Sequence, residues 1–221
     1  MSTKPVKLTP LGVMVLALLR EGDMHPYEMV RLLKQRRDDR MVSVTNGTLY
    51  HTVDRLHQQE LLAEVGVDRE GNRPERTTYT LTGAGRDAVV DWVRTELPDI
   101  DRPARFRVAL AEAHNLGRDE VIDLLTRRRE ALTADLAAHR AGLANAATRH
   151  VQEQFLVEVE RQSHLLHADL TWTDGFLARL ADPAYRWGVA ACTPDQHVTD
   201  QHAPDQHVTA PADTDPKDTT A

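Results

Sequence analysis

The stretch VTNGTLYHTVDRLHQQELL, residues 44–62, decides how the N-terminal part of this chain folds. The backbone N–H of Thr48 can donate to the hydroxyl of Thr45, three residues earlier, which is the arrangement of a helix N-cap. Apolar side chains at helical spacing then form one face, namely Leu49, Val53 and Leu56. The stretch therefore predicts a short amphipathic helix over residues 46–59.

Two further short helices are predicted before this one. Thr9 can cap the first, and Pro10 then occupies a helical position where a missing N–H costs nothing. The apolar spacing continues until Gly22 ends this helix. A second helix begins at Pro26, and basic residues dominate the chain that follows it. Three short helices in succession indicate a compact bundle.

After residue 62 the pattern changes to that of a β-hairpin. Segments 63–67 and 77–81 are rich in Val and Thr and flank the polar turn DREGNRPER. Thr82 can then cap another helix, which runs to residue 97 before two prolines. Helix, helix, helix, hairpin, helix is the order of a winged helix-turn-helix domain, and we place this domain at residues 1–97.

Residues 98–190 are predicted to be an α-helical dimerisation domain, so the fold class is mainly α, a winged helix-turn-helix followed by long helices. Two apolar seams with steps of three and four run through this region and imply partners. The two helices could satisfy each other as a hairpin within one chain. Because such a hairpin makes a thin core, we instead expect a homodimer, with a coiled-coil or four-helix interface. The seam residues expected to form it are Leu125, Leu132, Leu136, Leu143, Leu166 and Leu170.

The charge of the chain is unevenly distributed. The formal net charge is −7, but residues 191–221 hold six acidic residues and one lysine, so five of the seven excess negative charges lie there. This segment repeats PDQHVT at residues 194–199 and 204–209, and it reads as a disordered low-complexity tail. The acidic total therefore does not exclude a nucleic-acid partner.

Composition and motifs exclude several classes of function. A single cysteine rules out an intrachain disulfide, and no apolar run is long enough to span a membrane. The first residues lack the apolar core of a secretory signal, so a cytoplasmic location is expected. No catalytic motif stands in its expected context, and His164 with His167 supply only two ligands for a metal. We expect no enzyme activity, no cofactor and no metal.

The helix at residues 46–59 has the features of a helix that reads double-stranded DNA. In a helix-turn-helix, the N-terminal residues of the second helix meet base edges while its amide groups face phosphate. Gly47 permits close approach, and His51 and Arg55 could donate to guanine. Tyr50 could donate to the backbone or instead anchor neighbouring helices. The residues expected to contact DNA, including two in the hairpin turn, are Thr45, Asn46, Gly47, Thr48, Tyr50, His51, Arg55, Arg73 and Arg76.

Three segments together resemble the PadR family of bacterial transcription regulators. These are LTPLGVMVLALLREGDMHPYEMVRLL at residues 8–33, VTNGTLYHTVDRLHQQELL at residues 44–62, and RTTYTLTGAG at residues 76–85. Residues 44–50 are similar to the V-S-x-G-T-L-Y signature of that family, with threonine in place of serine. Asn46 and His51 stand where the family often has proline, and Pro26 stands where glycine is usual.

The resemblance implies a homodimeric DNA-binding regulator, expected to be a repressor on an inverted-repeat operator. Members of such a family often respond to phenolic or planar compounds, and Trp92 is the expected wall of a pocket for a small aromatic effector. The altered residues at positions 46 and 51 would change which operator is read. The alternative is a coiled-coil adaptor whose winged domain binds a protein partner.

Overall fold

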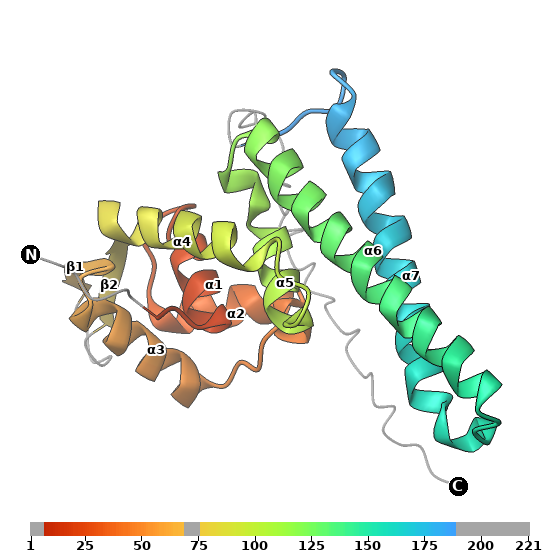
Figure 1. Ribbon diagram of the computed structural model, residues 1–221. Coiled ribbons are helices and arrows are strands. Elements are labelled where there is room, and N and C mark those ends of the chain that lie inside the picture. The colour runs from red at the N-terminus through yellow and green to blue at the C-terminus, as the bar shows by residue number, and fades with distance from the viewer. Residues whose placement is uncertain (1–6, 69–75, 189–221) are drawn as a thin grey trace, which may run out of the picture. The chain divides into compact units, whose positions relative to one another are not determined.

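The computed structural model describes residues 7–68 and 76–188, all within one compact unit, Met1–Ala191 (Figure 1). The tail predicted at residues 191–221 and the hairpin turn at residues 69–75 lie outside the described residues. The fold class is confirmed, since the described chain is mainly α with one two-stranded sheet. In chain order the helices and strands are α1 Pro10–Leu18, α2 Pro26–Gln35, α3 Asn46–Gln58, β1 Leu62–Asp68, β2 Arg76–Leu81, α4 Gly83–Glu96, α5 Pro103–Ala111, α6 Arg118–Thr148 and α7 Val157–Ala181, with short 3-10 turns at Asp38–Arg40, Ala113–Asn115 and Glu153–Phe155.

Helix α1 is the centre of the N-terminal core. The Thr9 hydroxyl accepts from the Gly12 N–H at 3.2 Å, and Pro10 is the first helical residue, as the sequence predicts. Val13, Val15 and Leu16 have no exposed surface. Since α1 is apolar on all sides, other helices must surround it, and it contacts α3, α4 and α5.

The hairpin is tied to the helices by a third, very short pairing. β1 and β2 are antiparallel, with Leu62 opposite Leu81 and an irregularity between Glu64 and Gly66. Met24, in the loop before α2, exchanges backbone hydrogen bonds of 3.1 and 3.2 Å with Tyr79 of β2. Three helices, this hairpin and α4 therefore form the winged-helix arrangement that the element order predicts.

The long helices α6 and α7 lie side by side and pair with each other (Figure 1). This arrangement corrects the expectation that their leucines form the seam between two chains. Leu132, Leu136 and Leu166 are buried in one cluster with Leu170, and Leu125 belongs to the main core with Phe176 of α7. Leu143 is partly exposed. An apolar repeat shows that a helix face is buried, but it does not show whether the covering helix belongs to the same chain.

Gly85, in the first turn of α4, provides a test of the close packing between α4 and the hairpin. A Cβ at Gly85 would lie 2.1 Å from the Leu61 carbonyl oxygen and 2.7 Å from Leu81 Cδ1. We therefore expect Gly85→Ala to lower the free energy of unfolding by about 2 kcal/mol. The measurement is urea unfolding followed by far-UV circular dichroism.

Gly83→Ala in the same helix is the matched control. A Cβ at Gly83 meets no atom within 4 Å, so this variant should be as stable as the parent or gain up to about 1 kcal/mol. Equal stability of the two variants would contradict the packing described for Gly85.

Candidate nucleic-acid interface

The N-terminus of α3 is closed by a reciprocal cap. The Thr48 N–H donates to the Thr45 hydroxyl at 3.1 Å, and the Thr45 N–H donates to the Thr48 hydroxyl at 3.0 Å. The first of these bonds confirms the predicted cap, whereas the second was not predicted. Both threonine side chains are thus engaged with the helix end, and their first role is to fix where α3 begins.

Helix α3 divides cleanly into a buried and an exposed face. Its apolar residues have at most 1% of their surface exposed, namely Leu49, Val53 and Leu56. The residues on the other side are exposed, namely Asn46, Gly47, Tyr50, His51, Asp54 and Gln58. Open space surrounds Gly47, where a Cβ would meet no atom within 4 Å. The capped tip of α3 therefore offers its amide groups and a polar face to solvent.

Tyr50 is 41% exposed, and the structure therefore does not bury it as an anchor between helices. The neighbouring side chain His51 is also exposed. The two residues lie one turn or less from the capped end, where a groove-binding helix makes its base contacts. Their position is compatible with the predicted DNA contacts, which remain a prediction.

Arg55 lies in a different environment from the other predicted contact residues. It is half-buried, and its Nη2 donates to the hydroxyl of Thr9, the cap residue of α1, at 3.0 Å. Its Nε is buried without a partner among the described residues. The guanidinium thus ties α3 to the start of α1, a tertiary contact that no sequence spacing indicates. Its predicted contact with guanine would require this bond to be given up.

The two predicted wing arginines are only partly covered by the described chain. Arg76 is the first residue of β2 and pairs with Asp68, so its backbone is placed at the open end of the hairpin. Arg73 lies outside the described residues.

A second basic surface lies where α2 gives way to the turn before α3. Arg36, Arg37, Asp39 and Arg40 line a hollow of about 610 Å³. Arg36 donates twice to Glu21, at 2.5 and 2.7 Å, and this pairing raises the pKa of the Arg36 guanidinium. The local excess of positive charge seen in the sequence is therefore partly neutralised by a residue from another part of the chain.

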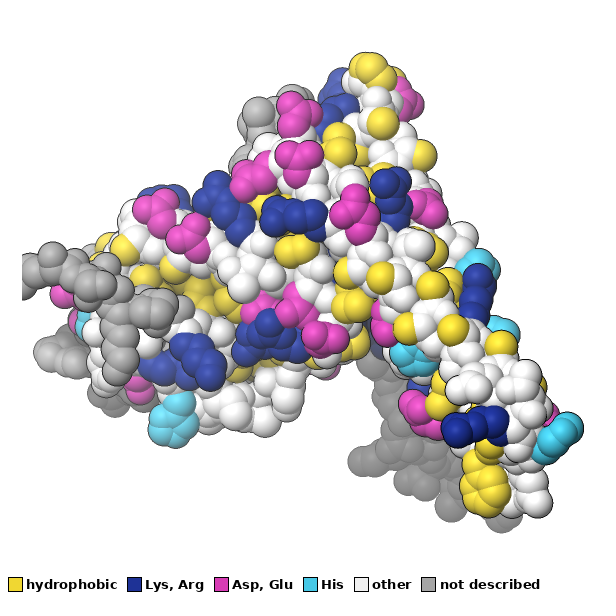
Figure 2. All heavy atoms as spheres, in the orientation of Figure 1, with side chains coloured by type: hydrophobic (Ala, Val, Ile, Leu, Met, Phe, Trp, Pro, Cys, Tyr) yellow, Lys and Arg dark blue, Asp and Glu magenta, His cyan; other side chains and the backbone are white. Residues whose placement is uncertain are grey.

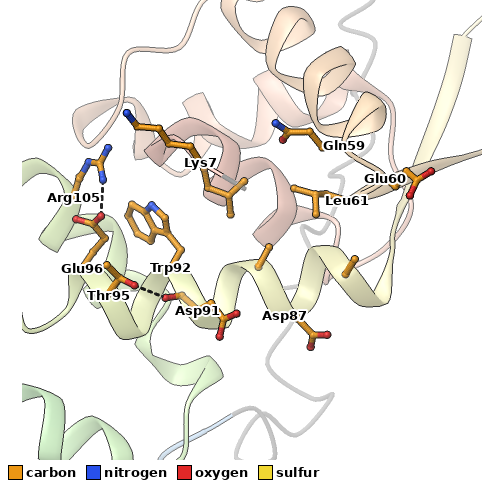
Figure 3. Close-up of a pocket in the computed structure, with 13 residues that line it drawn as sticks. Lys7, Gln59, Glu60, Leu61, Asp87, Asp91, Trp92, Thr95, Glu96 and Arg105 are labelled. Atoms are coloured by element: carbon orange, nitrogen blue, oxygen red, sulfur yellow. Dashed lines mark hydrogen bonds and ion pairs between the residues drawn. The ribbon is translucent and has the colours of Figure 1, made fainter. Parts of the chain in front are cut away.

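Trp92 of α4 lines a pocket of about 800 Å³, as the sequence predicts for this residue (Figure 3). One face of α4 forms a wall, and the other walls come from the turn between α3 and β1 and from the segment before α1. Trp92 is 8% exposed, and its indole N–H has no partner among the described residues. The pocket is formed within a single chain.

Glu96, at the end of the pocket, was not identified from the sequence. It is 2% exposed, and its Oε1 accepts from Arg105 at 2.5 Å and from Arg102 at 3.3 Å. Its Oε2 is buried without a partner among the described residues. A glutamate at the end of a helix carries no signal in the sequence that two arginines from the next segment will cover it.

Comparison with known proteins supports the resemblance seen in the sequence. The model of the transcriptional regulator PadR-like family matches residues 15–91. Residues 15–91 belong to this family. This PadR-like region runs from within α1 to within α4 and so includes the capped helix α3 and the hairpin. A search of curated proteins finds no match.

Several solved structures of PadR regulators are similar to this chain at low identity. Bacillus subtilis PadR in complex with operator DNA is 18% identical, with 78% of this chain and 99% of that chain covered and a TM-score of 0.38. Bacillus subtilis PadR in complex with p-coumaric acid is 18% identical, with 79% and 100% covered and a TM-score of 0.35. A PadR family regulator from Clostridium difficile is 18% identical, with 48% and 97% covered and a TM-score of 0.34.

Two other classes of site were searched for. Among residues 7–68 and 76–188, histidine, cysteine and carboxylate side chains do not gather in groups of three that could hold a metal ion. The helices of the described chain include none with the length and apolar character needed to cross a membrane.

The reciprocal cap of α3 leads to a prediction about stability. Thr45→Ala should lower the free energy of unfolding by about 1 kcal/mol, because the Thr48 N–H loses its acceptor. Thr48→Ala should cost a similar amount, and the double variant should cost less than the two single variants together, because both remove the same cap. Ser43→Ala, at an exposed position outside the cap, is the control for thermal unfolding. Strict additivity would mean that the two side chains act separately.

Proposed function

We propose that this protein is a homodimeric transcription regulator that binds double-stranded DNA through α3 and acts as a repressor. One observation carries the proposal: α3 presents a capped, open N-terminus and a polar face, while its three apolar residues are buried against the body. A helix with this division can enter a major groove without exposing its core. The PadR-like match over residues 15–91 supports the same assignment.

The proposed division of work on α3 follows from which side chains are already engaged. Thr45 and Thr48 fix the helix end, so the amides of the first turn face a phosphate. Asn46 and His51 are exposed and carry groups that can hydrogen-bond base edges. Arg55 supports the helix from behind through Thr9. Sequence selection is therefore assigned to positions 46 and 51, and docking to the cap.

The proposed dimer uses α7 rather than the buried seam leucines. Leu165 is 46% exposed and Trp172 is 39% exposed, and a spacing of seven residues places them on the same side of α7. Apolar side chains of this size in solvent are commonly covered by a partner. A two-fold dimer would present two α3 helices to half-sites about 34–36 Å apart, or a multiple of that distance.

The proposed regulator has an effector pocket at Trp92 and no catalytic role. The pocket is concave and open, and it combines an indole wall with a small number of buried polar atoms, which is the usual character of a small-molecule site. A small aromatic ligand bound against Trp92 would contact α4 and the turn at the end of α3 together. Binding there would therefore change the position of the reading helix.

The DNA-binding proposal is tested with a duplex selected by the protein itself from a random pool, measured by fluorescence anisotropy. His51→Ala should weaken binding by about tenfold through loss of a base contact. Gly47→Glu should weaken it further because the new carboxylate faces phosphate, yet the fold should be kept, since an acid in the first turn favours a helix. Affinity for DNA should fall steeply with added salt.

His164→Ala is the matched control, because His164 is an exposed histidine on α7, far along the chain from α3. Unchanged DNA affinity in both Gly47→Glu and His51→Ala would overturn α3 as the reading helix. Failure to select any duplex would favour the adaptor alternative instead.

The dimer proposal is tested by size-exclusion chromatography with light scattering. Leu165→Glu should convert the dimer to a monomer with unchanged far-UV circular dichroism, because the charge falls on an exposed apolar position. Leu132→Ala is the contrasting variant, since this leucine is buried between α6 and α7, and it should lower the free energy of unfolding by about 3 kcal/mol. A dimer that survives Leu165→Glu would exclude this face of α7.

A further inference from the structure

The Trp92 pocket holds buried polar atoms whose hydrogen bonds are not made within the chain. Glu96 Oε2, Trp92 Nε1 and Gln59 Oε1 all belong to residues that line it, and all three are buried without a partner among the described residues. A buried polar atom without a partner costs free energy, so a ligand or water that supplies the missing bonds is stabilised there. Two of the three atoms are acceptors and require a ligand that donates.

The charges around the pocket also favour a donor that is positively charged. The acidic side chains that line it are Glu60, Asp87, Asp91 and Glu96, and the basic ones are Lys7 and Arg105. Arg105 is already bonded to Glu96 (Figure 3). Acidic side chains thus outnumber basic ones by two, and a carboxylate entering the pocket would approach the buried Glu96 Oε2, a like charge in a poorly hydrated site.

The arrangement of the walls indicates the shape of the ligand. Trp92 forms one side, and small or apolar side chains, including Leu8, Leu61 and Ala88, form the floor around it. Figure 3 shows Trp92 beside Glu96 on α4, with Lys7 and Leu61 across from them. An indole face beside a carboxylate is suited to a delocalised cation, because the ring attracts positive charge and the carboxylate accepts its N–H groups.

We propose that the ligand of this pocket is a flat aromatic cation, an amidine or protonated amine, which stacks on Trp92 and donates to Glu96 Oε2. The inference rests on the proposed effector pocket and specifies its chemistry. It separates this chain from a regulator built for an aromatic carboxylate, since here the deepest free group is itself a carboxylate. The remaining N–H of Trp92 is available to a ligand acceptor or to a water.

The test compares two ligands that share a ring system and differ in charge. Isothermal titration calorimetry of the full chain without DNA would measure 2-naphthamidine, a cation at neutral pH, against 2-naphthoate, an anion. We expect the amidine to bind about tenfold more tightly, and the difference to shrink as salt is added, because part of it comes from the exposed carboxylates. The anion binding equally well or better would overturn the proposal.

Variants assign the preference to the pocket. Glu96→Gln removes the negative charge and should bring the two ligands to similar affinity, mostly by weakening the amidine. Because Glu96 also pairs with two arginines, Ala88→Leu provides a second variant that fills the pocket without touching those ion pairs. It should abolish binding of the amidine while thermal unfolding stays unchanged. Asp123→Asn, at an exposed position on α6, is the matched control and should bind as the parent does.

The outcomes separate this inference from the DNA-binding proposal. Amidine binding in a protein that selects no DNA would overturn the regulator function and keep the ligand class. Selection of DNA with neither ligand bound, including the case in which a second copy of the chain covers the pocket, would overturn the ligand class and keep the regulator. An amidine affinity unaffected by Ala88→Leu would place the cation elsewhere and also overturn the inference.

Discussion

The arrangement of the candidate interface depends on the packing of the apolar face of α3 onto α1. Helix α1 is buried on all sides, so its position is fixed by the core, and α3 can bury Leu49, Val53 and Leu56 only by lying against that core. The Arg55 bond to Thr9 fixes the same pair of helices at a polar point. Once these contacts are made, the residues between the apolar positions have no choice but to face solvent. The exposed polar face is therefore a consequence of core packing.

A second set of contacts joins the PadR-like domain to the long helices, through two buried charged side chains. Glu96, at the end of α4, accepts from Arg105 of α5, and the neighbouring Phe106 lies under the guanidinium of Arg128, 3.5 Å from its centre. Arg128 also donates to the Asp99 carbonyl and, at 2.9 Å, to Asp169 of α7. Burial lowers the pKa of Arg128, although Asp169 opposes this effect. Buried charges of this kind are costly to separate from their partners, so they fix the connection between the two regions.

The sequence predicts those parts of the structure that local chemistry determines. The cap at Thr45, the helix at residues 46–59 and the hairpin follow from spacing and turn residues within short windows. What the sequence could not supply are choices of tertiary partner. Leu132 and Leu166 were recognised as buried, but an apolar repeat is equally satisfied by a helix of the same chain or of another. Likewise, the contact of Arg55 with Thr9 joins residues far apart in the chain, and the partners of Glu96 depend on how the segment after α4 turns back.

The departures from the PadR signature can now be sorted by where they lie. Threonine in place of serine at position 45 keeps the cap, because the hydroxyl still accepts from Thr48. Pro26 is the first residue of α2, where its missing N–H is not needed, and the preceding His25 caps that helix by accepting from Tyr27 at 3.0 Å. Asn46 and His51, in contrast, are exposed on α3 and have no structural task that a proline could not leave to the cap. Differences that maintain the fold thus fall at helix ends, and differences that can alter recognition fall on the open face. A change of operator is therefore possible in this chain without any change in how the domain is built.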